Sequence, residues 1–181
     1  MIKNLIYFIL IILLFSPIKA EEIKFKFFGI ELGEKLNDES VLTGFDYFLH
    51  YQNEVGEEFI PKIKNEDFAK YWLVRGPISN KVFKINAQSY YQISQANCLN
   101  NRDEYVSHLK EKYKFTDIYE RTNIPVRPVL LSKNINEKDE LSISISCHPE
   151  GNYLHINFTF NYDEFNLEIN NKRKKIDKTG L

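Results

Sequence analysis

The stretch of residues 141–162 alternates apolar and polar side chains along two arms that a short break separates. A two-residue period is typical of a β-strand that buries one face. The residues between the apolar positions are serines, histidines, asparagines and a threonine, which predict a second face that is polar and solvated. We therefore expect a β-hairpin whose inward residues are Leu141, Ile143, Ile145 and Cys147 on the first arm and Leu154, Ile156, Phe158, Phe160 and Tyr162 on the second.

The same alternation predicts how the two arms pair. If His148 lies opposite Tyr153, every inward residue meets an inward residue, and a slip by one position would expose the whole apolar row. The inner face then pairs Cys147 with Leu154. The outer face pairs Ser146 with His155, Ser144 with Asn157 and Ser142 with Thr159.

A second hairpin is expected upstream of the first. Residues 71–74 are rich in strand formers and are followed by Gly76, Pro77 and a Ser79-Asn80 turn. A further strand runs from residue 82 to about residue 91. Its alternation places Phe83, Ile85 and Ala87 on one face and Lys84, Asn86 and Gln88 on the other.

Residues 94–114 carry the clearest helical pattern of the chain. Apolar residues recur at three- and four-residue steps, and Ser94 or Asn97 is the expected N-cap. The charged residues Arg102, Asp103, Lys110 and Glu111 are expected on the outer side of this helix. The order β-β-α-β-β predicts an α+β fold, an antiparallel sheet with this one main helix packed on one face.

The remaining segments are less regular. Residues 23–27 predict a short strand followed by turns at Gly29 and Gly33, residues 38–51 fit either a helix or a strand, and residues 53–67 predict a loop. Residues 121–137 contain two prolines and predict an exposed connection, with residues 129–131 as a candidate edge strand. Residues 163–170 fit a strand or a helix, and residues 171–181 predict a flexible polar tail.

The N-terminus has the three parts of a secretory signal peptide: a basic start at Lys3, an uncharged segment over residues 5–15, and Ala20 before two glutamates. A membrane anchor is the alternative, but the apolar segment is shorter than the roughly 20 residues that span a bilayer. We expect cleavage after Ala20. The products are a signal peptide over residues 1–20 and a single domain over residues 21–170, exported to the periplasm or the exterior of a bacterial cell.

The chain has two cysteines, Cys98 and Cys147, and both follow the predicted cleavage site. In an exported protein a lone pair of cysteines is most simply a disulfide. It would join the predicted helix to the predicted hairpin. A reactive thiol is the alternative, but the chain has no Cys-x-x-Cys and Cys147 occupies an inward strand position.

The sequence offers no motif for a catalytic nucleophile, a metal site or a cofactor. His148 and His155 share the outer face of the hairpin, and Glu150 lies in its turn. These three residues are the nearest approach to a metal or catalytic site. Two solvated histidines on a polar face are the simpler interpretation, so no catalytic, cofactor or metal residue is predicted.

Aromatic residues make up 14% of the chain, and several of them cluster near strand ends. Exposed patches rich in tyrosine often mark binding surfaces, although the same rings also suit a small core. The candidate binding surface is formed by Tyr71, Trp72, Tyr90, Tyr91, His148 and His155.

The formal net charge of −1 argues against nucleic acid or an anionic membrane as the main partner. The leading hypothesis is a non-enzymatic exported module that binds another protein or an envelope component. The alternatives are an inhibitor or immunity-type protein that neutralises a toxin or hydrolase, and an enzyme whose site is assembled from scattered residues. The oligomeric state is not predicted.

Hydrophobic spacings and the two cysteines recur through the chain as Phe28-Gly29-Ile30-x-Leu32-Gly33, Tyr71-Trp72-Leu73-Val74, Pro77, Val82-x-x-Ile85-x-Ala87, Cys98, Leu109-x-x-Lys112-Tyr113, Ile145-x-Cys147 and Leu154-x-Ile156. In these residues the chain resembles small exported bacterial proteins without an assigned activity. The resemblance spans most of the chain after residue 20. It implies export and a disulfide, and no activity.

Overall fold

The computed structural model describes residues 25–49, 54–92, 94–115, 117–123, 126–135, 137, 139–149 and 152–179. The predicted signal peptide and Glu150 lie outside the described residues. Neither α2 (Gln95–Tyr113) nor α3 (Tyr162–Thr179), the two α-helices of the described residues, combines the length and apolar character that crossing a bilayer requires.

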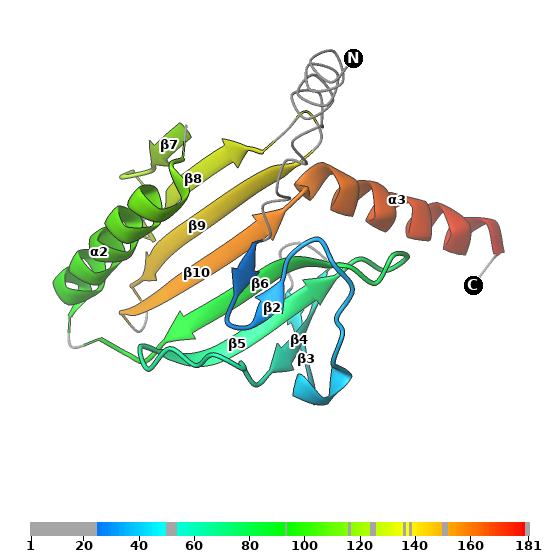
Figure 1. The fold of residues 1–181 in the computed structure, drawn as a ribbon, viewed down its shortest axis with the longest axis horizontal. Helices are drawn as coiled ribbons and strands as arrows, with labels where there is room; N and C mark the ends of the chain where they lie inside the picture. The colour runs from blue at the N-terminus through cyan, green and yellow to red at the C-terminus, as the bar shows by residue number, and fades with distance from the viewer. Residues whose placement is uncertain are drawn as a thin grey trace, which may run out of the picture.

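Within the described part of the chain, eight strands form one antiparallel sheet in the order β3-β4-β5-β6-β10-β9-β8-β7. The strands are β3 (Leu42–Leu49), β4 (Glu54–Phe59), β5 (Phe68–Arg75), β6 (Val82–Ser89), β7 (Asp117–Glu120), β8 (Val129–Asn134), β9 (Glu140–His148) and β10 (Tyr153–Phe160). Figure 1 shows α2 at one end of this twisted sheet and α3 projecting from the other. The fold is α+β, as the sequence predicts.

The hairpin of β9 and β10 forms in the predicted register. His148 pairs with Tyr153, Cys147 with Leu154 and Ser146 with His155, and the pairing continues to Leu141 and Phe160. The inward residues of this hairpin from Leu141 to Phe158 are buried, none exposing more than 4% of its surface. The upstream hairpin of β5 and β6 is also confirmed, and its second strand pairs with β10. The two predicted hairpins are therefore neighbours at the centre of the sheet.

The predicted helix is α2, and it packs against β9 and β10. The Ser94 hydroxyl caps it by accepting a hydrogen bond from the backbone N–H of Asn97 at 3.2 Å, and Lys114 ends it in a left-handed conformation. Val106 and Cys98 lie in the core between helix and sheet. We call the side of the sheet that α2 covers the helix face.

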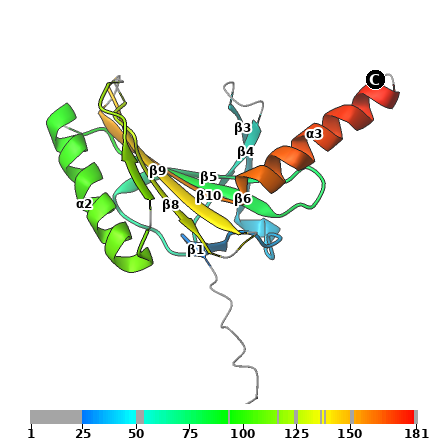
Figure 2. The ribbon, with the colours of Figure 1, turned by 90° about the horizontal axis from the view of Figure 1, so that it is seen from above.

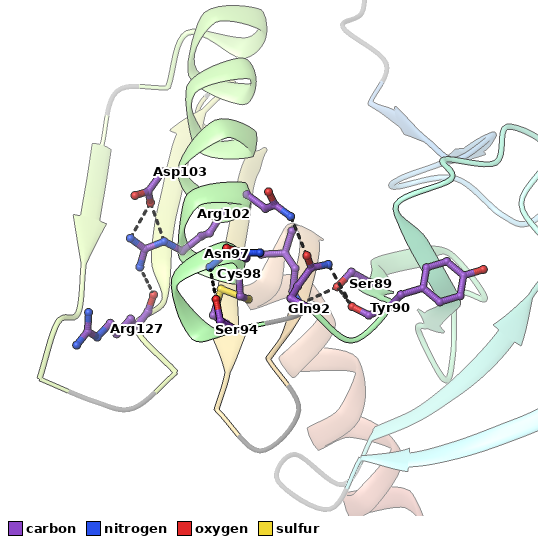
Figure 3. The surroundings of a disulfide bond; sticks show 12 residues. Ser89, Tyr90, Gln92, Ser94, Asn97, Cys98, Arg102, Asp103 and Arg127 are labelled. Carbon is purple, nitrogen blue, oxygen red and sulfur yellow. Dashed lines mark hydrogen bonds and ion pairs between the residues drawn. A yellow bond between two sulfur atoms is a disulfide. The ribbon is translucent and has the colours of Figure 1, made fainter.

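Cys98 of α2 and Cys147 of β9 form the predicted disulfide, with their Cα atoms 5.9 Å apart. The bond joins the first turn of α2 to the end of β9 that leads into the hairpin turn. Figure 3 shows Cys98 on the helix among Ser94, Asn97 and Arg102. The described residues contain no free cysteine.

Arg102 does not take the outer position that the sequence predicts for it. Only 5% of Arg102 is exposed, because its guanidinium lies between α2 and the segment that leads to β8. It donates to the carbonyl oxygen of Arg127 at 2.6 Å and pairs with Asp103 at 2.6 Å (Figure 3). It also pairs with Glu120 at 2.9 Å. A buried cation is tolerated where oxygen atoms surround it, and here the Arg127 carbonyl and the carboxylates of Asp103 and Glu120 provide them.

A small N-terminal hairpin completes the cover of the helix face. Its strands β1 (Lys26–Phe27) and β2 (Ile30–Glu31) are joined by Phe28 and Gly29, both with positive φ. The ring of Phe27 stacks on Phe158 of β10 with 3.8 Å between ring centroids. The predicted first strand and its turn are thus confirmed for the described residues, and they close the main core beside α2.

Helix α3 leaves the sheet on the side opposite to α2 (Figure 2). Its Phe165 packs with Val74 and Phe83 in a second, smaller core. The Glu168 carboxylate accepts hydrogen bonds from the backbone N–H groups of Ile78 and Ser79, each at 3.0 Å. These contacts settle the open prediction for residues 163–170 as a helix, and the backbone is helical on through Thr179, where the sequence predicts a tail.

The structure corrects several other predictions. Of the segment 38–51, the described residues 38–49 are neither all helix nor all strand: a 3₁₀ turn, Glu39–Val41, precedes β3, and residues 50 and 51 lie outside the described residues. The predicted loop at residues 53–67 contains β4. The predicted edge strand is β8, but β7 lies outside it. Phe83 belongs to the second core and not to the face of Ile85, because the β5–β6 pairing shifts register between Val74 and Arg75.

Candidate functional site

The side of the sheet opposite α2 carries polar residues across its three central strands. We call it the polar sheet face. Cross-strand pairing aligns Gln88 with His155 and Ser146, Asn86 with Asn157 and Ser144, and Lys84 with Thr159 and Ser142. On the β5 side, Trp72 continues the row of Asn86. This face takes in the outer face that the sequence predicts for β9, β10 and β6, so one surface collects polar residues from all three.

The polar sheet face is less solvated than the sequence predicts. Lys84 exposes 2% of its surface, Asn86 3%, and Ser146 and Thr159 8% each. Part of this burial comes from α3, since the Lys84 ammonium lies 5.1 Å from the ring centroids of both Tyr162 and Phe165. A cation held over ring faces can be stabilised without bulk water. The result is a surface of hydrogen-bonding groups partly withdrawn from solvent.

Five aromatic rings form a continuous row on this face, from the end of β6 across β10 and β9 to β5. Tyr91 meets Tyr153 edge-on at 6.1 Å, and Tyr153 stacks on His148 at 4.7 Å with 8° between the ring planes. His148 lies 5.9 Å from His155, and His155 stacks on Trp72 at 5.2 Å and 18°. Each spacing is within the range in which ring pairs attract. We call these five residues, Tyr91, Tyr153, His148, His155 and Trp72, the aromatic row.

The row changes from exposed to buried along its length. Tyr91 exposes 76% of its surface at one end, and Trp72 exposes 8% at the other. Trp72 lies flat enough on the sheet that a Cβ built on Gly56 of the neighbouring strand would fall 2.7 Å from its Cδ1 atom. The glycine at position 56 is therefore what allows the indole to occupy this place. Trp72 is also the only tryptophan of the chain.

On this face, Nδ2 of Asn86 and Nε2 of His155 find no hydrogen-bond partner among the described residues. Buried polar atoms of this kind are uncommon, because each one forfeits its hydrogen bond to water. Burial, together with the charge of nearby His148, lowers the pKa of His155 to about 4. His155 is consequently neutral at physiological pH.

The six residues of the predicted binding surface do not form one patch. Trp72, Tyr91, His148 and His155 belong to the aromatic row. Tyr71 points to the helix face, exposes 4% of its surface, and donates a hydrogen bond to the carbonyl oxygen of Asn65 at 2.8 Å. Tyr90 is 56% exposed, but it lines a cavity on the α2 side. Tyr90 and Tyr91, adjacent in the sequence, thus lie on opposite sides of the sheet.

The cavity that Tyr90 lines has a volume of about 620 Å³ and lies between α2 and the ends of β6 and β10. Its wall includes Asp67, which accepts a hydrogen bond from the Tyr105 hydroxyl at 2.5 Å. Burial, reinforced by this bond to Asp67, raises the pKa of Tyr105. Asn65 donates to the same hydroxyl at 3.1 Å, so the polar groups at this point satisfy one another.

The arrangement on the polar sheet face suits binding through ring stacking and neutral hydrogen bonds. Among the described residues, no three histidines, cysteines, aspartates or glutamates come close enough to hold a metal ion. His148 and His155 do lie side by side as the register predicts, but their neighbours on this face are rings, amides and hydroxyls. The geometry therefore presents recognition groups, and its one clearly perturbed histidine is a weak base.

Tyr153 and Asn86 belong to this surface but not to the predicted binding surface. The sequence could have indicated Tyr153, because the predicted register places it opposite His148. Asn86 was expected to be solvated, and only the packing of neighbouring strands and Trp72 shows it to be buried.

Comparisons with models of protein families, with curated proteins and with solved structures found no match to this chain.

Proposed function

We propose that this protein is an exported, non-enzymatic binding module that receives its partner on the polar sheet face. The observation that carries the proposal is the aromatic row. It is a continuous series of rings that begins at the well exposed Tyr91 and ends among buried polar groups. Rings beside hydrogen-bonding groups bind through contact area and directionality at once, which is why they are enriched at interfaces.

Export is supported by two independent features. The N-terminal 20 residues have the composition of a signal peptide. Cys98 and Cys147 form a disulfide, and structural disulfides persist mainly in oxidising compartments outside the cytosol. Together they favour the periplasm or the cell exterior as the place of action.

A binding role is favoured over catalysis by the character of His155. A general base works best with a pKa near the working pH, and the pKa of His155 is held at about 4. Its ring is stacked on Trp72 and its Nε2 atom is buried. These features suit a side chain that shapes a surface.

The proposal is tested by capturing partners from envelope extract with immobilised protein and with three single variants. Tyr91→Ala and His148→Ala remove rings from the aromatic row, while Tyr90→Ala removes the neighbouring exposed tyrosine that lines the α2 cavity. We expect one component to be retained by the wild type and by Tyr90→Ala, and to be lost or reduced about tenfold by the other two, equivalent to ~1.4 kcal/mol of binding free energy.

Retention that is equal for all four proteins would place the partner elsewhere and contradict the proposal. So would the absence of any retained component together with turnover of a substrate. If the retained component is a toxin or hydrolase, the module acts as an inhibitor or immunity-type protein, which is a special case of the same proposal.

A further inference from the structure

The chemistry of the polar sheet face narrows the class of ligand, provided that the proposed binding role holds. The nine central positions on β6, β10 and β9 carry amides, hydroxyls, one histidine and a single formal charge, that of Lys84. Lys84 is covered by Tyr162 and Phe165 of α3. His155 is neutral near pH 7. The centre of the face therefore offers an incoming group hydrogen bonds without charge.

An anionic ligand is disfavoured by this arrangement, because phosphate and carboxylate groups are recognised by arginine and lysine side chains or by helix N-termini. A cationic ligand is equally disfavoured, since no carboxylate stands among the nine central positions. Asn86, Asn157 and Gln88 carry amides, and every amide both donates and accepts. The complement of such a surface is a neutral group that also does both, and a hydroxyl is the simplest example.

The aromatic row adds a second requirement, an apolar surface on the ligand. Tyr91, Tyr153 and His148 form the accessible end of the row: Tyr91 is exposed and the other two are half-buried. Tyr91 meets Tyr153 edge-on at 6.1 Å and Tyr153 stacks on His148 at 4.7 Å, so the three rings form one extended apolar strip, which favours a ligand of several linked rings over a single small molecule. A sugar unit has an edge of hydroxyls and a face of C–H groups, and a chain of such units matches both features of this surface.

From these observations we infer that the polar sheet face binds a neutral polysaccharide, with sugar rings packed against the apolar strip of Tyr91, Tyr153 and His148 and hydroxyls bonded to the amides of Gln88 and Asn157. Asn86 lies next in the row of Asn157, and its Nδ2 atom has no partner among the described residues. A ligand hydroxyl that reaches this atom would replace the hydrogen bond to water that the amide loses on burial. Binding would thereby offset the cost of burying the Asn86 amide.

The test uses Trp72 as a built-in reporter, because it is the only tryptophan and lies at the inner end of the aromatic row. The purified protein is titrated with maltohexaose, cellohexaose and fully N-acetylated chitohexaose, which are neutral hexasaccharides, and with hexagalacturonate as a charged counterpart. Tryptophan fluorescence and calorimetry are recorded together. We expect at least one neutral hexasaccharide to bind, and hexagalacturonate to bind about tenfold more weakly or not at all.

Matched variants locate the binding. Tyr91→Ala and Asn157→Ala should weaken the dissociation constant about tenfold, while Tyr90→Ala should leave it within about twofold of the wild type. Both tyrosines are exposed, so neither substitution removes core packing, and circular dichroism checks that all variants are folded.

The inference is overturned if no neutral hexasaccharide binds, if hexagalacturonate binds as tightly, or if binding survives Tyr91→Ala unchanged. The capture experiment separates this failure from failure of the proposed function. If a protein is retained in a manner that depends on Tyr91 while no sugar binds, the polar sheet face is the binding surface and the polysaccharide assignment is wrong. If nothing depends on Tyr91 in either experiment, both are wrong.

Discussion

At the scale of single residues, the unusual positions are those where a polar strand face is packed and not solvated. His155 stacks on Trp72, and Trp72 has room on the sheet because position 56 is glycine. Asn86 shares the same buried surroundings. The Nε2 atom of His155 and the Nδ2 atom of Asn86 give up their hydrogen bonds to water, so both are expected to lower the stability of the free protein slightly while shaping the surface.

His155 makes this cost measurable through pH. Its pKa is about 4 in the folded protein, lowered by burial and by nearby His148, against 6.5 for an unperturbed histidine. A lowered histidine pKa means that the unfolded chain binds the extra proton between these values. The free energy of unfolding therefore has its full value, as far as His155 is concerned, above pH ~6.5. It falls progressively as the pH drops to about 4, by up to ~3 kcal/mol.

Urea denaturation of the wild type and of His155→Gln at pH 7 and at pH 4.5 checks this expectation. The free energy of unfolding should fall more steeply with acid in the wild type, because the variant has no imidazole to protonate. His108→Gln is the matched control, since it removes an exposed imidazole from α2 and leaves His155 in place. Parallel acid profiles for the wild type and His155→Gln would show that His155 is not buried in this way.

At the scale of secondary structure, alternation and helical spacing predicted the elements whose own residues form the core. The β9–β10 hairpin was predictable down to its register because every inward position is apolar. The strand β4 was not, because its sequence Glu-Val-Gly-Glu-Glu-Phe has weak strand propensity. Its neighbours stabilise it instead: Gly56 admits Trp72, and Glu57 accepts two hydrogen bonds from Arg75.

Two further elements show the same limit of local pattern. All four residues of β7 are exposed, so no buried face marks it in the sequence, and it is held by pairing with β8. In α3, Phe165 and Ile169 face the second core while Leu167 is 61% exposed. The three residues alternate in the sequence, but only the first and last share a helical face. Tertiary contacts therefore decided both elements.

The disulfide is the link between elements whose removal has the clearest expected effect. It closes a sequence separation of 49 residues between α2 and β9. In the chain-entropy model, loss of a cross-link over such a loop costs about 4 kcal/mol. We expect the double variant Cys98→Ala, Cys147→Ala to unfold at a lower urea concentration than the wild type, and its free energy of unfolding to be lower by this amount.

Mass spectrometry of the non-reduced, alkylated protein provides the companion measurement. No cysteine should be alkylated in protein isolated from its native compartment. The matched comparison is the wild type with and without reductant, since reduction should reproduce the loss of stability in the double variant. Two alkylated cysteines in untreated protein would refute the bond, and with it one of the two supports for export.

At the scale of the whole molecule, the two sides of the sheet are covered unequally. The helix face is closed by α2 and the β1–β2 hairpin, whereas α3 covers only the end of the polar sheet face near Val74 and Phe83 (Figure 2). The sequence predicts which residues of the β9–β10 hairpin share each side, but its prediction for Phe83 of β6 is wrong. It did not predict the aromatic row as a whole, because its members come from three strands and a loop that only the folded sheet brings together.

The central claim is that partners bind the polar sheet face, and photocrosslinking tests it most directly. The photoreactive residue p-benzoylphenylalanine is placed at Ser144, at the centre of that face, or at Ser107, which is exposed on α2. After irradiation in envelope extract, we predict a higher-mass adduct from position 144 and none from position 107. An adduct from position 107 with none from position 144 would contradict the account.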